Sequence, residues 1–395
     1  MEKSKLDERA LKLKSLIEQE FQGMGWTLTD NRFMPPASSD KNEIRQWHKA
    51  QRIERATSTR KIVEKFGSAL IQEFADGKEV VPQNFAPELV PVLSGSQESN
   101  LFRFATLLWS VPVSNGYGRR MRYLIRDSSN GKLVGIFALM DPVFNLRVRD
   151  KEINWNSEQR KARLYHVMDA NVLGAVPPYD RLLGGKFVAL AIVSDQVRHD
   201  FALKYRGRET IIQETQKKAS LVLITTTSAL GRSSIYNRLH LPNESERTYR
   251  SVGYSEGWGH FHISDATFKK LRDWMRDIKD PYADGHQYGD GPNWRMRAIR
   301  RGLDLLGFDG NSLWHGIKRE AFLAPLASNY KEFLRGENSR PQYYHRDLAA
   351  IADFFKERWM LPRSERVNEW KNWTRSDTWK LIAENCGWAI NLMAL

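Results

Sequence analysis

Apolar residues near the amino terminus recur at the spacing of an α-helix. Leu13, Ile17 and Phe21 lie four residues apart with charged residues between them, which predicts an amphipathic helix that ends near Gly23. Further along, Asp40 is followed three residues later by glutamate, a capping-box spacing that predicts a second helix starting at about residue 41. The chain therefore opens with a helical region.

The pattern changes after residues 80–100, which are rich in Pro, Ser and Gly. Two short apolar runs at 121–126 and 132–140 are separated by a turn at 127–131, which predicts a β-hairpin. Residues 165–172 and 221–227 indicate further strands, and 182–205 between them have the pattern of one helix or a broken pair. Alternation of strands and helices predicts an α/β fold with a central mixed sheet.

Helical spacing returns from Ser264, which is placed as a helix cap, and again over residues 293–306. We therefore predict four regions: a helical region at 1–80, a linker and entry segment at 81–120, an α/β core at 121–263, and a mainly helical region at 264–395.

Composition narrows the class of protein. The chain has 395 residues, of which 41% are hydrophobic, and a single cysteine, Cys386, which rules out an internal disulfide and a thiolate zinc cage. No apolar run reaches the roughly 20 residues of a membrane-spanning helix, and the charged first 14 residues lack the apolar core of a secretory signal. We predict a cytoplasmic protein. The net charge of +14 favours a polyanionic partner, nucleic acid ahead of an acidic membrane surface.

Basic residues gather on two of the predicted helices. Four share one face of the second helix, and a further group lies at the start and on the outer face of the late helix: Arg45, Lys49, Arg52 and Arg55 in the first; Trp294, Arg295, Arg297, Arg300 and Arg301 in the second. Cations beside an aromatic ring suit a nucleic-acid backbone. The alternatives are a solvated face partly neutralised by Glu43 and Glu54, and a tryptophan packed in the core.

The segment RLLGGK at 181–186 lies where a strand is expected to pass into a helix. Arg181, Gly184, Gly185 and Lys186 could hold a phosphate or pyrophosphate on free backbone N–H groups, although an ordinary tight turn explains the same residues. The spacing resembles the acyl-coenzyme A loop of GNAT-type acetyltransferases at Arg181 and Gly184, and departs from it at Lys186. The resemblance implies a GNAT-like order of strands more than a bound cofactor, so the cofactor stays unknown.

Two histidines alternate in the segment GWGHFH at 257–262. If the segment is extended, His260 and His262 point to the same side and could exchange protons. A metal would need a further ligand, for which Asp265, His286 and His240 lack diagnostic spacing, so we predict no metal ligand. Structural histidines are the competing explanation.

A further phosphate site is expected after the strand at 221–227, because ligands collect at the carboxyl ends of strands in α/β folds. Arg232 and Arg238 lie there beside hydroxyl residues: Ser233, Ser234 and Tyr236.

Several motifs occur together in order: LVGIFALMDPVFNLRVRD at 133–150, Trp155, RLLGGK at 181–186, TSALGRSS at 227–234, GWGHFH at 257–262 and GPNWR at 291–295. On these motifs the chain resembles the DruA family, the first component of the Druantia antiphage defence system of bacteria. The resemblance spans residues from about 123 to the carboxyl end. It implies a defence role alongside partner proteins, one of them a large helicase-like protein, and it brings no assigned catalytic residues.

Three functions follow from these observations. The first is a defence component that binds nucleic acid, DNA ahead of RNA, through its basic helices. The second is a GNAT-like enzyme that transfers a group to nucleic acid or protein, with the donor at residues 181–186 and His260 or His262 handling the proton. The third is a metal-dependent nuclease.

Overall fold

The computed structural model describes residues 2–36, 40–113, 116–207, 220–242, 244–285 and 292–388. Their contacts divide the chain into two compact units. Unit 1 consists of Met1–Arg55 with Ser255–Arg319, and unit 2 consists of Ala56–Tyr254 with Glu320–Leu395. Each unit thus joins segments that are distant in the sequence, whereas the four predicted regions follow one another along the chain.

Unit 2 contains a seven-stranded sheet in the order β3-β4-β5-β6-β7-β9-β8. The strands are β3 (Pro87–Pro91), β4 (Arg120–Asp127), β5 (Lys132–Met140), β6 (Val167–Ala175), β7 (Leu223–Thr227), β8 (Arg250–Tyr254) and β9 (Glu320–Pro325). Neighbours pair antiparallel except β6 and β7, which are parallel. The sheet is therefore mixed, and helices flank it, which confirms the predicted fold class.

Most of the local predictions in this unit are confirmed. The hairpin is β4 and β5, and the strands expected at 165–172 and 221–227 are β6 and β7. The helical pattern of 182–205 forms a broken pair, α7 (Gly184–Ala191) and α8 (Asp195–Tyr205). Because β6 and β7 are parallel, this helical crossover is what a connection between them requires. Residues 81–120, expected as a linker, include β3, α4 (Gln97–Ala105) and the 3₁₀ turn η3 (Thr106–Leu108).

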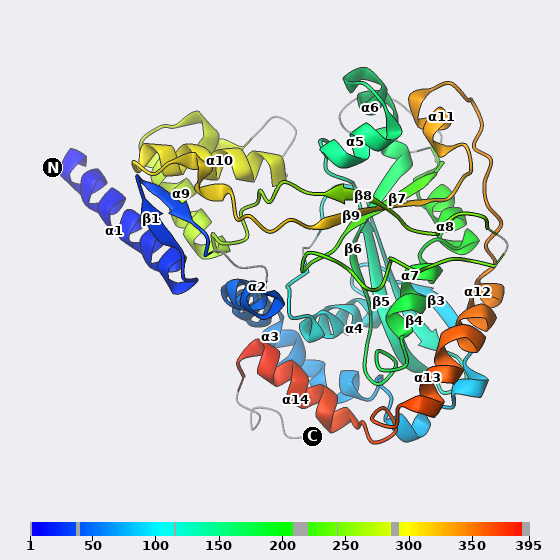
Figure 1. The fold of residues 1–395 in the computed structure, drawn as a ribbon. Helices are drawn as coiled ribbons and strands as arrows, with labels where there is room; N and C mark the ends of the chain where they lie inside the picture. Colours follow the sequence, from blue (N-terminus) through cyan, green and yellow to red (C-terminus); the bar gives the residue numbers. More distant parts are fainter. Residues whose placement is uncertain are drawn as a thin grey trace. The chain divides into compact units, whose positions relative to one another are not determined.

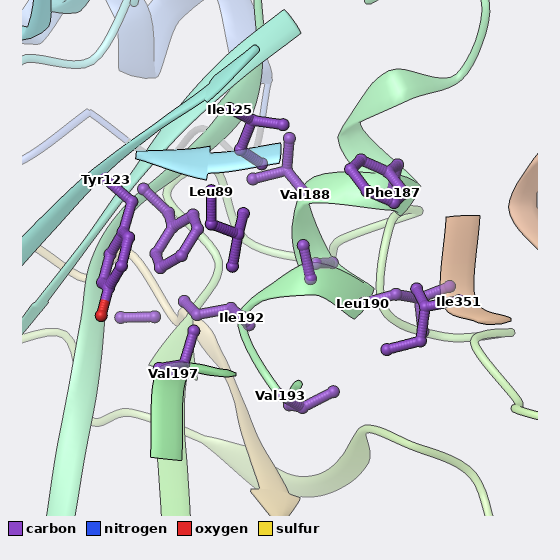
Figure 2. Packing of buried hydrophobic residues seen from close by; sticks show 14 of the residues in the cluster. Leu89, Tyr123, Ile125, Phe187, Val188, Leu190, Ile192, Val193, Val197 and Ile351 are labelled. Carbon is purple, nitrogen blue, oxygen red and sulfur yellow. The ribbon is translucent and has the colours of Figure 1, made fainter. Parts of the chain in front are cut away.

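Helices pack on the sheet and on one another (Figure 1). Helix α7 packs on β5 and β6, and α12 (Leu348–Phe355) packs on α7; the π-helical turn η7 (Lys356–Met360) and α13 (Leu361–Arg366) follow α12. The apolar core around α7 includes Phe187, Val188 and Leu190 of α7 and Ile351 of α12 (Figure 2). Helix α7 is apolar almost throughout because it is covered by both the sheet and α12.

The other helices of unit 2 complete the covering of the sheet. Helix α14 (Arg375–Cys386) packs on η3, α4 packs on β4, α5 (Arg147–Ile153) packs on β8 and β9, and α6 (Ser157–Arg163) packs on α11 (Tyr330–Arg335). Short 3₁₀ turns join the elements: η1 (Gly77–Glu79), η2 (Pro82–Asn84) and η4 (Leu164–His166).

Strand β6 is irregular at the centre of the sheet. Ala138 pairs with Val172 and Leu139 pairs with Ala170, so Asn171 is an extra residue in β6. On its other edge, β6 pairs with β7 only from Val167 to Asp169. A β-bulge bends a strand and redirects its side chains, and here the parallel ladder ends beside it.

Unit 1 contains α1 (Glu2–Gly23), the hairpin β1 (Thr27–Thr29) and β2 (Arg32–Met34), α2 (Lys41–Trp47), α9 (Asp265–Asp277) and α10 (Pro292–Leu305), with the turns η5 (Pro281–Asp284) and η6 (Gly310–Leu313). Its core joins α1, the hairpin, α9 and α10; Phe21 and Phe33 stack there with ring centroids 4.0 Å apart. Among the described residues, no helix combines the length and apolarity needed to cross a membrane.

The second predicted helix begins as expected and then breaks. Asp40 caps α2 by accepting the N–H groups of Asn42 and Glu43. The helix ends at Trp47, His48 has φ −87° and ψ 3°, and α3 (Lys49–Ile71) starts anew. The expected continuous basic face is therefore interrupted at His48.

Candidate functional site

Helix α10 carries exposed arginines on its outer face, opposite the buried residues Ile299 and Leu303. Arg297 forms no ion pair with a described carboxylate. The guanidinium of Arg300 lies 5.3 Å from the ring centre of Trp258, and Arg301 Nε donates to Asp280 Oδ2 at 3.0 Å while its side chain stays 48% exposed. The late helix therefore has the accessible cations that its sequence pattern predicts.

The start of α10 is packed rather than open. Trp294 is only 6% exposed; its indole N–H donates to the carbonyl of Tyr282 at 3.2 Å. Arg295 bonds to Asp265 and lies over the ring of Phe268 at 4.6 Å. The exposed ring suggested by the sequence is absent at Trp294, because the side chain joins α10 to α9 and η5.

The early basic residues are mostly engaged within the chain. Arg45 donates to the Asn42 side chain at 2.7 Å, and Arg52 donates to the carbonyl of Arg45 at 2.5 Å, across the helix break. Arg55 is half-buried, whereas Lys49 is exposed. Glu54 does not neutralise this face but accepts the N–H groups of Asp265 and Ala266 at the start of α9. These arginines thus serve the internal structure of unit 1, and their role in binding stays a prediction.

The two predicted histidines lie in a loop and turn, so the condition of an extended segment is not met. The N–H of Ile263 bonds to the carbonyl of His260, which bends the chain between them. His262 is 3% exposed, and its ring lies 4.9 Å from that of Trp26 and 5.0 Å from that of Phe21. The left-handed backbone of Gly257, φ +77°, helps to end the extended chain after β8 before it reaches the histidines.

Two more histidines, His48 and His315, join this buried cluster in unit 1. Burial lowers the pKa of His48 and of His260 to about 4 and that of His315 to about 3, and it lowers the pKa of His262 well below its usual value. These rings are neutral at pH 7. Among the described residues no group of three His, Cys, Asp or Glu side chains could hold a metal ion; the candidate ligand His286 lies outside those residues.

In the glycine turn at the start of α7, backbone N–H groups bond to carbonyls of the same chain. The N–H of Gly184 donates to the carbonyl of Tyr179 at 2.8 Å, and a Cβ at Gly184 would lie 2.7 Å from that oxygen, so only glycine fits. The N–H of Lys186 bonds to the carbonyl of Leu183, which has φ +63°. Close backbone approach accounts for Gly184 without a ligand, and the cofactor assignment of Arg181, Gly184, Gly185 and Lys186 stays a prediction.

The segment after β7 packs inward in part. Tyr236 is 6% exposed and stacks on Tyr249 at 4.9 Å, and the N–H of Ser233 donates to Glu320 at 3.3 Å. Arg232 and Arg238 are exposed. Tyr236 is thus a core residue, and the arginines remain accessible.

A half-buried carboxylate that no sequence motif indicated lies on β6, where the ladder with β7 ends. Asp169 accepts a hydrogen bond from Thr225 Oγ1 at 2.6 Å. Burial raises its pKa to about 6, against the opposing effects of Thr225 and the nearby charge of Arg149. Arg149 is itself fully buried and donates to Asp150 and to the carbonyls of Val143 and Phe144. A carboxyl in this state can exchange a proton close to neutral pH.

The comparisons with known proteins agree on one family. The family model described as Druantia protein DruA matches residues 38–336. A curated protein named Druantia protein DruA, from Escherichia coli strain UMEA 4076-1, is 44% identical over 378 residues, which is 95% of this chain and 93% of that protein. The chain belongs to the DruA family. Membership indicates a component of a Druantia antiphage defence system. No solved structure matches the chain.

The match to the DruA family model covers α10, the histidine cluster, the glycine turn and Asp169. It ends before a second set of cations and aromatic rings in this DruA-family chain, at Trp359 and Trp373 near the carboxyl end. The guanidinium of Arg181 lies 3.7 Å from the ring centre of Trp373, and the ammonium of Lys186 lies 5.5 Å from that of Trp359. The sequence signal that could have revealed this set is the density of Trp and Arg between residues 356 and 375.

Proposed function

We propose that this DruA-family protein binds nucleic acid within its defence system, and that α10 supplies phosphate contacts. The carrying observation is the outward-facing group on α10, where Arg297, Arg300 and Arg301 lie within two turns and are exposed. Cations three or four residues apart on a helix repel one another by a few tenths of a kcal/mol per pair unless an anion lies against them. A phosphate backbone removes that repulsion and releases counterions.

The apolar face of α10 supports this assignment. Ile299 and Leu303 are fully buried in the core of unit 1, so the helix is fixed with its arginines outward. Arg300 is further held over Trp258, and Arg301 is positioned by Asp280, which neutralises part of its charge. Contacts of this kind are made to the backbone rather than to base edges, so they predict binding with little dependence on sequence.

The test is charge reversal on α10. Arg297→Glu, Arg300→Glu and Arg301→Glu together are expected to weaken DNA binding at low salt by more than tenfold and to reduce the salt dependence of the affinity by about 2–3 in log–log slope. The matched control reverses three exposed cations of α3, Arg60→Glu, Lys61→Glu and Lys65→Glu, and is expected to bind nearly as the parent does. Equal affinities of parent and α10 variant for both DNA and RNA at low salt would contradict the proposal.

The nucleic acid and the protein partners are separate parts of the proposal. Oligonucleotides of one sequence are compared in competition as duplex DNA, single-stranded DNA and RNA, and we expect DNA to bind more tightly than RNA.

Purification from phage-infected cells is expected to recover other proteins of the defence system, including a helicase-like one. Recovery of this chain alone would count against a multi-protein assembly.

Group transfer is a second candidate function, and Asp169 favours it. A carboxyl with a pKa of about 6 at the end of a parallel ladder is suited to accept a proton from an attacking group. The donor would lie at residues 181–186. Calorimetry with acetyl-coenzyme A is expected to show saturable binding weakened by Lys186→Glu, and the absence of any heat at millimolar ligand would remove an acyl-coenzyme A donor.

A further inference from the structure

Two tryptophans near the carboxyl end of unit 2 are each covered by a cation, one from the turn before α7 and one from the first turn of α7. Arg181 lies over Trp373 at 3.7 Å, and Lys186 lies over Trp359 at 5.5 Å. Both rings are half-buried, so they anchor the cations and still reach the surface. A guanidinium stacked on a ring has lost much of its rotational freedom before any ligand arrives.

The turn that carries Trp359 has an unusual backbone with a local cause. Pro362 has no N–H to donate, and the five residues Lys356–Met360 before α13 form a π-helical turn in place of a regular α-helix. In this turn Trp359 packs edge-on against Phe354 at 5.3 Å, and Arg358 lies 5.7 Å from its ring centre. Arg363 in the following helix donates to the carbonyl of Arg181 at 3.2 Å, which ties the two segments together.

Three of these cations have no carboxylate partner among the described residues. No described carboxylate forms an ion pair with Lys186, Arg238 or Arg358, whereas Arg181 is held by Asp180 at 3.0 Å. Burial and, after it, the charge of Arg238 lower the pKa of Lys186, which means that two positive groups are close without an anion between them. An external anion would relieve this repulsion.

We propose that this tryptophan–cation surface, made of Arg181, Lys186, Arg238, Arg358, Trp359 and Trp373, binds the backbone of a single strand of nucleic acid. The proposal rests on the proposed function and adds a contact on unit 2 to the one on α10. Alternating cations and aromatic rings are the combination by which proteins hold single strands, where phosphates meet the cations and bases reach the rings. A flexible strand can follow both tryptophans, whereas a free phosphate would engage only one cation pair.

The experiment reverses the two outermost cations and leaves the tryptophans in place. Arg238→Glu with Arg358→Glu, in the full chain, is compared with Arg60→Glu and Lys61→Glu, which change the charge of unit 2 equally. Binding of a fluorescent 20-nucleotide single strand is followed by anisotropy over a salt series. We expect at least a tenfold loss of affinity and a salt slope smaller by about 1.4, since each lost phosphate contact on a single strand contributes about 0.7.

A second variant separates ligand binding from folding. Trp359→Phe keeps an aromatic ring in the core and is expected to retain thermal stability while it weakens single-strand binding by a few-fold. If the Arg238/Arg358 variant matches its control in affinity and slope while the α10 variant loses binding, this inference fails and the proposed function stands. If the parent binds no nucleic acid, both fail. If the Arg238/Arg358 variant loses binding to phosphatidylserine vesicles but still binds the single strand as the parent does, the surface is assigned to a membrane and the inference is overturned.

Discussion

The two units bury ionisable side chains in different chemical states. In unit 1 the buried groups are mainly imidazoles, His48, His262 and His315, packed against aromatic rings and held neutral, beside Asp280, which pairs with the exposed Arg301. In unit 2 they include charged pairs such as Arg346 with Glu244, at 2.6 Å, and Arg149 with Asp150, at 2.7 Å. The stability that depends on a buried neutral imidazole is lost when acid protonates the ring. The stability that depends on a buried ion pair is lost when one partner is removed.

The comparison also helps to recognise cations that are available to a ligand. An arginine of unit 2 that serves the core has a carboxylate within ion-pair distance, as Arg346 and Arg375 do. By contrast, Arg297 of unit 1 and Arg238 of unit 2 have no such partner among the described residues. Position on a basic helix is therefore a weaker criterion than the absence of an internal carboxylate.

The largest expected effect comes from breaking a buried pair of unit 2. Glu244→Gln leaves the guanidinium of Arg346, whose side chain is 3% exposed, without a carboxylate among the described residues, and with the carbonyl of Pro325 and a neutral amide as hydrogen-bond partners. We expect a loss of about 3–5 kcal/mol in the free energy of unfolding, measured with urea. Glu246→Gln removes a partner of Arg250 from an exposed pair and is expected to cost about 0–1 kcal/mol. Equal costs would contradict a paired core in unit 2.

Acid is expected to destabilise unit 1 through its imidazoles. The folded pKa of His48 is about 4, below the unfolded value of 6.5, so the unfolded chain binds more protons between these values and stability falls as the pH falls. At pH 5 this histidine alone accounts for about 2 kcal/mol. His48→Gln should lose correspondingly less stability than the parent between pH 7 and pH 5. Urea unfolding at each pH measures the free energy of unfolding of both proteins. The exposed His199→Gln is the control, and the same loss in both variants would be evidence against the prediction.

Asp169 is expected to respond to pH in the opposite direction. Its folded pKa of about 6 lies above the unfolded 3.8, so the ionised form is disfavoured in the fold and stability is lost as the pH rises through 6. The parent should lose about 1.5 kcal/mol of folding stability between pH 5 and pH 7.5, and Asp169→Asn, which keeps an acceptor for Thr225, should not show this loss. The control Asp353→Asn, at an exposed position, should lose as much stability as the parent. A parallel pH dependence of parent and Asp169→Asn would mean that the carboxyl is solvated.

Sequence pattern predicted what depends on near neighbours. The β4–β5 hairpin follows from alternating runs around a turn, α2 starts at its predicted cap, and the buried stripe of α10 follows from helical spacing. The sequence pattern did not predict β9. Glu320–Pro325 forms a strand by inserting between β7 and β8, and both of these lie far from it in the sequence. Strand pairing across such separations leaves little trace in a local window.

The candidate site shows the same limit. Spacing identified Arg297, Arg300 and Arg301 as neighbours, and they are exposed together. Spacing alone did not indicate that Arg52 would bond to the carbonyl of Arg45 or that Trp294 would be buried, because both depend on a helix break or on another helix. Trp359 and Trp373 were missed for a related reason: the cations that cover them come from α7 and the turn before it, more than 170 residues earlier.

The smallest expected effect compares one helix cap from each unit. Ser264 accepts the N–H of Thr267 at 3.0 Å and donates to Glu20 at 2.7 Å, which joins α9 to α1, whereas Ser96 accepts the N–H of Ser99 at 3.3 Å and donates to the nearby carbonyl of Leu93. Alanine should cost about 1 kcal/mol at either cap. We expect Ser264→Ala to cost a few tenths of a kcal/mol more, because Glu20 also loses a donor. Thermal unfolding of the two variants measures the difference, and a larger cost at Ser96 would show that the bond to Glu20 does not stabilise unit 1.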